Sequence, residues 1–434
     1  PGRLCRRGRG DRSVGGVRDD AEQRDEPAPS GEGLLDRALR VLGSFSEDEP
    51  ALTAAELGAR AALSSSTLHR LLARLVDRGL LVRLPDRRYA IGPRLWELGE
   101  LSPLALRLRE TALPHMLRLY EATGDARWRL AAADYTTRTA PAKFDKSQHD
   151  LGFMLGASYG NGYRLTGDPA YRDALLAGAT TLVTRFNPKV GSIQSWDLWK
   201  NSNWAFPVIV DNLMNLELLT WAARAAVEPR YREIAVTHAD TTLRNHFRPD
   251  GSSFHLVDYD PQTGKIRSRV TVQGNADASS WARGQAWALY GYTMMYRETK
   301  KEDYLRQAHK IAAFFMQHPR LPADKVPYWD FDDAAIPNAP RDSSAAAIVA
   351  SSLLELAGFS NDAQARTYRA FAEAQLRSLA SPAYLASGGE NGNFLLKHAT
   401  GHKPAGKEID VPLNYGDYYF LEALLRLKRA QAGS

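Results

Sequence analysis

Residues 32–60 show the hydrophobic pattern of two short helices. Leucine, alanine and valine side chains recur at helical spacing over residues 34–42, which predicts an amphipathic helix. Thr53 precedes Glu56 by the spacing of a capping box, so a second helix is expected to open there and to run through Arg60. A short turn then leads to the next element.

A third helix is expected from about Ser66 to Arg78. Leucines at helical spacing supply its inner face, and Gly79 follows as a C-cap. Two short runs, residues 80–83 and 88–91, predict strands around a Pro-Asp-Arg turn. Three helices followed by a two-stranded wing are typical of a winged helix-turn-helix, whose third helix enters the major groove of DNA.

From about residue 104 to residue 430, the pattern becomes a series of helical hairpins. A helix ends at a short polar turn, such as the Thr-Gly-Asp turns at 123–125 and 166–168, and an aromatic residue opens the next helix. The aromatic positions are Trp128, Tyr171, Tyr231, Tyr304 and Tyr368. Their intervals of about 40 to 75 residues favour stacked or ring-closed αα-hairpins. Connections that are long and differ in chemistry favour a closed α/α toroid over an open solenoid.

Composition excludes several classes of protein. No run approaches the ~20 apolar residues with which a helix crosses a bilayer. The single cysteine, Cys5, excludes an intramolecular disulfide and a cysteine-built zinc or iron–sulfur site. The arginine-rich start has no apolar stretch after it, so we expect no secretory signal there and a cytoplasmic location. Residues 1–31 contain almost no large apolar side chains and are expected to form a disordered tail.

Positive charge gathers in the predicted winged unit. Residues 60–94 hold eight arginines and only two acids, a surplus equal to the net charge of +6 of the whole chain. Such a patch suits phosphate, although a solvated arginine-rich face or a protein-interaction module would show the same pattern. We favour nucleic acid, contacted by the start of the third helix and by the wing. The candidate DNA-binding residues are Ser65, Ser66, Thr67, His69, Arg70 and Arg87.

The run from residue 37 to residue 99, which includes ALSSSTLHRLLARLVDRGLL, resembles the DNA-binding domain of the IclR family of bacterial transcription regulators. Such regulators continue into their own effector-binding domain, of which this sequence shows no trace. Lysine first appears at Lys143, and most tryptophans lie after residue 150, so the chain joins two units of different composition. We expect a disordered tail, a winged helix-turn-helix, a linker helix with the junction, and a helical domain, with boundaries at 1–31, 32–100, 101–125 and 126–430.

Asp211 is the strongest candidate for acid–base chemistry. It lies inside an apolar run, PVIVDNLM, at residues 207–214. Burial raises the pKa of a carboxyl group, as a general acid requires. The alternative is an N-cap aspartate or one paired with an arginine. Further along, SWARGQAW at 280–287 combines aromatic faces, a guanidinium and an amide, which are the groups that a sugar acid needs.

These segments also resemble a family of enzymes. The matching segments are HDLGF (149–153), VDNLMNL (210–216), SSFH (252–255), QG (273–274), SWARGQAW (280–287), YWDF (328–331), PRDSSAAAI (340–348) and YGDYYFLEALLRL (415–427). In order and spacing they are similar to glycoside hydrolase family 88, the unsaturated glucuronyl hydrolases, over about three quarters of the chain. The resemblance implies a mainly α fold, an (α/α)6-type barrel, and neither metal nor cofactor.

The resemblance also implies a reaction. The substrate would be an oligosaccharide left by a polysaccharide lyase, ending in a uronic acid with a C4=C5 double bond. An acid protonates C4, water adds at C5, and the hemiketal opens and releases the sugar. By position, Asp211 matches the general acid/base and Asp150 the second essential carboxylate. The matching substrate-pocket positions are His149, Trp196, His255, Gln273, Arg283 and Trp287.

The sequence departs from this family at its start. The family opens with an extra helix and an aromatic-rich loop, where this chain has residues 106–120 instead, so the first barrel helix is expected to be absent or replaced. Two functions therefore remain open: a hydrolase tethered to a DNA-binding domain, or a transcription regulator whose barrel binds sugar as an effector sensor and does not turn it over.

Overall fold

The computed structural model describes residues 33–46, 49, 51–84, 86–92, 116, 118–198, 203–388 and 390–432. The tail expected at 1–31 lies outside these residues, as does most of the linker expected at 101–125. Contacts divide the chain into two compact units, 1–102 and 103–434, and each is described by itself. The first unit contains the helices α1 (Leu34–Leu42), α2 (Ala54–Arg60) and α3 (Ser65–Asp77), and the strands β1 (Ala51–Leu52), β2 (Leu81–Arg83) and β3 (Tyr89–Ile91).

Local signals in the first unit place its helices where the sequence predicts them. Thr53 Oγ1 accepts from the backbone N–H of Glu56, whose carboxylate accepts from Thr53 in return, so the capping box that opens α2 is formed. Gly79 follows α3 with a φ of +68°, a left-handed conformation that costs glycine little. The strand β1 was not predicted, because two residues carry no periodicity, and only its antiparallel pairing with β3 creates it.

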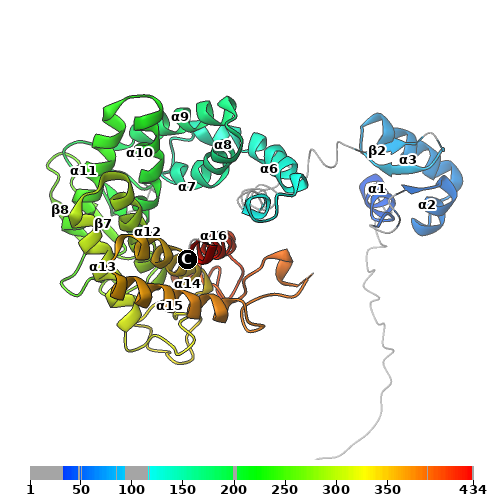
Figure 1. The fold of residues 1–434 in the computed structure, drawn as a ribbon. Helices are drawn as coiled ribbons and strands as arrows, with labels where there is room; N and C mark the ends of the chain where they lie inside the picture. Colours follow the sequence, from blue (N-terminus) through cyan, green and yellow to red (C-terminus); the bar gives the residue numbers. More distant parts are fainter. Residues whose placement is uncertain are drawn as a thin grey trace, which may run out of the picture. The chain divides into compact units, whose positions relative to one another are not determined.

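The second unit is built mainly of helices that come in pairs (Figure 1). The outer helices are α6 (Ala126–Arg138), α9 (Pro169–Val183), α11 (Pro229–Asn245), α13 (Glu302–Gln317) and α15 (Asp362–Leu379). The inner helices are α7 (Leu151–Leu155), which continues through a π-helical turn into α8 (Asn161–Thr166), α10 (Leu216–Ala225), α12 (Ala282–Thr299), α14 (Ser343–Leu356) and α16 (Asn414–Ala432). Because α12 and α14 are almost wholly buried, they take apolar or small residues on nearly every face.

The aromatic residues of the hairpin repeat tie the outer helices together. Three tyrosine hydroxyls reach back to the preceding outer helix, with distances that are ordinary for hydrogen bonds. The contacts are Tyr231 with Thr180 at 2.9 Å, Tyr304 with Asp240 at 2.8 Å, and Tyr368 with His309 at 2.8 Å. The repeat therefore marks where neighbouring hairpins meet.

Residues 118–123 fill the inner position between α8 and α16. Arg118 is buried and forms an ion pair with Glu422 of α16. Glu121 accepts from Arg164 of α8 at 2.6 Å. The first inner helix of the barrel is thus replaced rather than absent over the residues that the structure describes.

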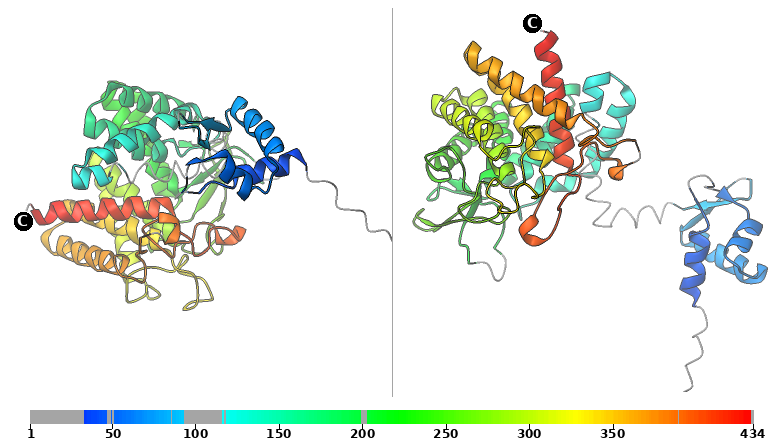
Figure 2. Two further views of the ribbon diagram at one scale, coloured as in Figure 1. Left: turned by 90° about the vertical axis from the view of Figure 1, so that its right-hand side faces the viewer. Right: turned by 90° about the horizontal axis from the view of Figure 1, so that it is seen from below.

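The two ends of the barrel differ. Figure 2 shows loops and short strands gathered at the end opposite the C-terminus, where the inner helices begin. Among them is an antiparallel sheet of β6 (Pro207–Ile209), β7 (Leu256–Tyr259) and β8 (Ile266–Val270), in the order β6-β7-β8. At the other end, short turns join each inner helix to the next outer one. The Thr-Gly-Asp turns are of this kind, with Asp125 and Asp168 capping α6 and α9.

Candidate functional site

Asp211 lies at the loop-rich end of the barrel, in the 3₁₀ helix η3 (Val210–Asn215), which leads from β6 into α10. The apolar run that surrounds it packs into the core, so only 8% of Asp211 is exposed. Burial raises the pKa of its carboxyl group to about 7, a rise that Arg283 opposes and Asp150 reinforces. It forms no ion pair with an arginine within the described residues, and Oδ2 has no hydrogen-bond partner there.

His255 stands beside this carboxyl group. Its Nε2 lies 4.0 Å from Asp211 Oδ2. Its Nδ1 accepts the backbone N–H of Val272 at 3.0 Å, so the neutral ring carries its proton on Nε2, the nitrogen nearest Asp211. Burial, aided by Arg283, lowers the pKa of His255 to about 3. The ring is therefore a neutral neighbour that supplies no positive charge to Asp211.

Asp150 precedes α7 and brings a second carboxylate to the same end of the barrel. His149 Nε2 lies 3.2 Å from Asp150 Oδ1, and the amide of Asn215 donates to the same oxygen at 3.4 Å. Asn215 also accepts the backbone N–H of Phe153 at 3.0 Å. A Cβ on Gly152 would lie 2.4 Å from Asn215 Cα, so only glycine allows α7 to come this close to η3.

Arg283 is held in the first turn of α12 by acceptors from the loops. Its Nη1 donates to Asp342 Oδ2 at 2.8 Å and to the carbonyl of Thr400 at 2.5 Å, and its Nη2 donates to the carbonyl of Gly401 at 2.6 Å. The side chain is 2% exposed. Gln273 donates to the same Gly401 carbonyl at 3.1 Å, so one loop fixes both residues.

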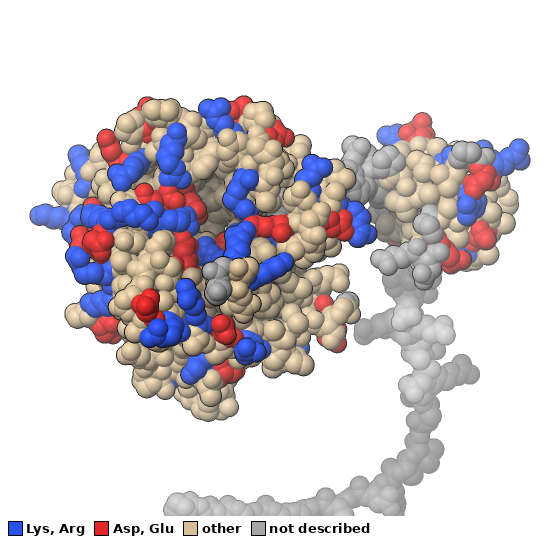
Figure 3. Space-filling model, viewed as in Figure 1, with Lys and Arg blue, Asp and Glu red and all other residues tan. Residues whose placement is uncertain are grey.

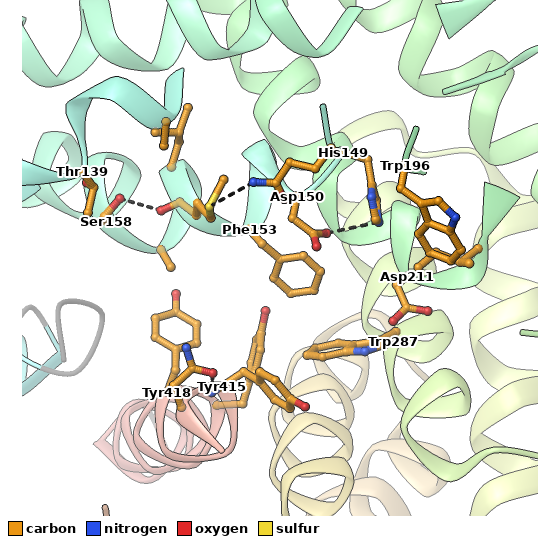
Figure 4. A pocket seen from close by; sticks show the side chains of 18 of the residues that line it. Thr139, His149, Asp150, Phe153, Ser158, Trp196, Asp211, Trp287, Tyr415 and Tyr418 are labelled. Carbon is orange, nitrogen blue, oxygen red and sulfur yellow. Dashed lines mark hydrogen bonds and ion pairs between the residues drawn. The ribbon is translucent and has the colours of Figure 1, made fainter. Parts of the chain in front are cut away.

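These groups surround a cavity of about 690 Å³ that is rich in aromatic side chains (Figure 4). Trp287 lies one helical turn after Arg283 on α12, and its ring meets those of Phe153, Tyr415 and Tyr419 edge to face, with centroids 4.9, 5.6 and 5.5 Å away. Carboxylates at one side and aromatic faces at the other suit a sugar ring with acidic and hydroxyl groups.

The structure brings the predicted residues together. The cavity is lined by His149, Asp150, Trp196, Asp211, Gln273, Arg283 and Trp287. His255 is not among the lining residues and reaches the site through its contact with Asp211. Their chemical roles stay predictions, because position alone does not test them.

Sequence reasoning gave no role to three other residues of the site. Asn215 binds Asp150, Asp342 holds Arg283, and Tyr415 lies against both Trp287 and Arg283. All three belong to segments that carry the family resemblance. Their partners lie far away in the sequence, so no spacing within a segment could have shown these contacts.

Comparison with known proteins supports the same picture. The model of Glycosyl Hydrolase Family 88 matches residues 111–429. The chain belongs to this family. It is a glycoside hydrolase of the unsaturated glucuronyl hydrolase type. The expected fold, a mainly α barrel, is confirmed. The model of the IclR helix-turn-helix domain matches residues 34–85, which confirms the resemblance of the winged unit to the IclR family.

Relatives within family 88 match most of the length of this chain. An unsaturated glucuronyl hydrolase of Formosa agariphila is 48% identical over 309 residues, which cover 71% of this chain and 76% of the relative. A crystal structure of an unsaturated glucuronyl hydrolase specific for heparin has a TM-score of 0.72 and 40% identity, and covers 92% of this chain and 98% of that one. The enzyme of Bacillus sp. GL1 has a TM-score of 0.68 and 33% identity, over 73% and 84%.

The winged unit exposes most of its candidate DNA-binding residues. Ser65, Ser66, His69, Arg70 and Arg87 are exposed, and Thr67 is half-buried. Within the described residues, Arg70 and Arg87 form no ion pair, whereas Arg60 of the basic patch is bound to Glu49. Arg87 has a φ of +70° at the tip of the wing, between β2 and β3.

The described residues contain neither a membrane-spanning helix nor a cluster of metal-ligand side chains. No helix among them is long and apolar enough to cross a membrane. In the same part of the chain, no three side chains of histidine, cysteine, aspartate or glutamate come together as metal ligands.

Proposed function

We propose that the chain hydrolyses oligosaccharides that end in an unsaturated uronic acid, by hydration of the C4=C5 double bond. The observation that carries this proposal is the buried Asp211, whose pKa of about 7 keeps a large fraction of its carboxyl groups protonated near neutral pH. An enol ether needs a proton donor of this kind, since C4 must be protonated before water can add at C5.

Asp211 acts first as acid and then as base. Its proton passes to C4, the oxygen of a water molecule bonds to C5, and the carboxylate takes the proton that this water loses. The product is a hemiketal that opens and releases the remaining sugar. Because the neighbouring His255 is neutral, its ring does not compete for the carboxylate of Asp211 when this group takes the proton back.

Asp150 and the residues around it hold the sugar. Asp150 binds ring hydroxyls, and its negative charge reinforces the protonation of Asp211. His149, Trp196, Gln273 and Trp287 line other parts of the cavity. The two tryptophans offer faces for stacking, and His149 and Gln273 offer hydrogen-bonding groups. Arg283 places a positive charge in this wall for the sugar carboxylate while Asp342 keeps it in position.

The test is incubation of the full chain with unsaturated disaccharides from chondroitin, heparin and pectin, followed by the ultraviolet absorbance of the conjugated double bond. The absorbance is expected to decay with at least one of them and to persist with Asp211→Asn. Asp173→Asn, an exposed aspartate on α9, is the matched control and should retain the activity of the natural chain. Persistence of the absorbance with every substrate would refute the proposal.

A second candidate function is transcription regulation, and the IclR-type unit specifically favours it. Arg70 and Arg87, which form no ion pair among the described residues, are free to contact bases and phosphates. In this function the barrel acts as an effector sensor that binds an unsaturated disaccharide. A two-half-site operator would then require a dimer.

Gel-shift titration with DNA from upstream of glycan-degradation genes separates the two functions. The regulator predicts retardation that changes when unsaturated disaccharide is added, and at least tenfold weaker binding by Arg70→Ala. Arg306→Ala, an exposed arginine of α13, is the control for a lost charge in the other unit. If the chain binds no DNA, or binds it equally with and without the disaccharide, the regulator is refuted and the hydrolase is the remaining candidate.

A further inference from the structure

A second cavity, of about 590 Å³, lies at the end of the barrel where the inner helices finish. Four side chains line both cavities and so form the partition between them: Phe153, Ala157, Tyr418 and Tyr419. Figure 3 shows the face on which α16 ends as a hollow bordered by lysine and arginine side chains. This cavity takes no part in the reaction proposed above.

Arginine is the most frequent charged residue in the wall of the second cavity. Its lining includes six arginines and three glutamates. The arginines are Arg118, Arg164, Arg224, Arg297, Arg426 and Arg429, which come from five different segments of the inner ring. Glu121 and Glu355 pair with these arginines from outside the lining, and the arginines still outnumber the glutamates.

Several of these guanidinium groups keep donors available. Each arginine has five N–H donors, more than one carboxylate can accept. The side chains of Arg224 and Arg429 are each 60% exposed, although each pairs with a glutamate. Arg118 is buried, and its Nε has no hydrogen-bond partner among the described residues.

Two aromatic side chains stand in the same wall. Tyr163 and Trp221 meet edge to face, with ring centroids 5.8 Å apart, and both are only partly buried. An aromatic face beside a group of guanidinium forks suits a ring that bears an oxyanion, and the volume of the cavity is within the range of small-molecule sites.

We propose that this second cavity is a binding site for a small sugar ester of sulfate or phosphate, separate from the hydrolytic site. The oxyanion binds the guanidinium groups of Arg224 and Arg429 at the mouth and of Arg118 further in. The sugar ring lies against Trp221. Sulfate and phosphate esters share this chemistry, and the probes below distinguish them.

Titration calorimetry of the full chain tests the site with four probes: inorganic sulfate, inorganic phosphate, N-acetylglucosamine 6-sulfate and glucose 6-phosphate. None of them has a C4=C5 double bond. At least one ester is expected to bind saturably, and more tightly than its inorganic anion because of the contact with Trp221. The tighter ester identifies the source of the ligand.

The double variant Arg224→Gln/Arg429→Gln should weaken binding at least tenfold. Glu298 and Glu121 keep other arginine partners in it, so the fold is expected to survive. Arg306→Gln, on the outer helix α13, is the matched control and should bind as the natural chain does. Trp221→Ala, which keeps every charge, gives a second measurement if the double variant does not fold, and should abolish the preference for the ester.

Three results would overturn the proposal: no saturable binding of any probe, equal weakening by the control variant, or displacement of the ester by an unsaturated disaccharide in the Asp211→Asn chain. The last result would place the ester in the hydrolytic site. Since turnover plays no part in this measurement, its outcome is independent of whether the chain proves to be a hydrolase.

Discussion

Asp211 lines the first cavity of the barrel and Glu422 lines the second, and the two are buried to a similar degree, with 8% and 5% of their surface exposed. Burial raises the pKa of Asp211 to about 7. Burial acts in the same direction on Glu422, but Arg426 and Arg118, with hydrogen bonds from Ser351 and Tyr290, lower its pKa to about 2.

The difference teaches that neighbours, more than burial, decide the charge of an interior carboxyl group. Glu422 accepts hydrogen bonds from Ser351 at 2.7 Å and Tyr290 at 3.1 Å, in addition to its arginine partners. Asp211 has a neutral histidine 4.0 Å away and a negative Asp150 nearby. The first cavity therefore holds a proton ready for transfer, and the second holds a negative charge that binds the inner helices together.

The largest effect is expected from Asp211→Asn, which removes the proton donor and leaves the cavity intact. Turnover should fall about 10³-fold, within the range for loss of a general acid, while KM changes little. Steady-state kinetics on an unsaturated disaccharide measures both constants. A variant that keeps even a tenth of the activity would remove Asp211 from the mechanism.

Glu422→Gln tests the charged carboxylate of the second cavity. The free energy of unfolding should drop by about 3 kcal/mol, because Arg118 and Arg426 lose a buried anionic partner. Urea denaturation measures it. Glu373→Gln, whose pair with Arg377 is exposed at 4.0 Å, is the control and should change stability by less than ~0.5 kcal/mol.

The effect of Glu422→Gln on the free energy of unfolding should depend on pH, and the lowered pKa of Glu422 gives the direction. The folded-state pKa of Glu422 is lowered, so its contribution to stability is present above the unfolded pKa of about 4.5 and disappears as the pH falls toward 2. The natural chain and Glu422→Gln should therefore converge in acid. A difference in stability that stays constant from pH 5 to pH 2 would contradict the assignment.

Catalysis should respond to pH in the opposite sense. The reaction needs Asp211 protonated, so kcat/KM should fall about tenfold per pH unit well above the pKa of about 7. A profile of kcat/KM from pH 5 to pH 9 measures this. A rate that rises through pH 7 would mean that the unprotonated form is the active one.

Asn215→Ala is expected to have the smallest effect. The amide that holds Asp150 Oδ1 and the backbone of Phe153 is lost, so Asp150 is less well oriented and kcat/KM should fall about fivefold, with the pH profile unchanged. A shift of the pH profile instead would show that Asn215 acts on the protonation of Asp211.

Much of the fold could be predicted because its signals are local. Thr53 with Glu56, Gly79, and the Thr-Gly-Asp turns each satisfy or end a helix within a few residues of their own position. The strand β1 could not be predicted, because its two residues form a strand only by pairing with β3. Leu52 pairs with Tyr89, which lies 37 positions further along the chain. The filling of the first inner position by residues 118–123 likewise depends on partners in α8 and α16.

The candidate site divides in the same way. Segments such as HDLGF and SWARGQAW indicated which residues would line it, and the cavity contains seven of the eight predicted pocket and catalytic residues. The sequences of these segments could not predict the contacts that one segment makes with another. Asn215 on Asp150, Asp342 on Arg283, and the loop carbonyls of Thr400 and Gly401 are all long-range.

The sequence by itself determined that two units of different composition are joined, that one is a winged helix and the other a ring of helical hairpins, and that Asp211 lies in an apolar run. Only the tertiary structure decided which interior carboxyl group holds a proton. An apolar run sets the burial of a side chain, but its pKa depends on charges and hydrogen-bond donors brought in from other helices, and those distances exist only after the ring has closed.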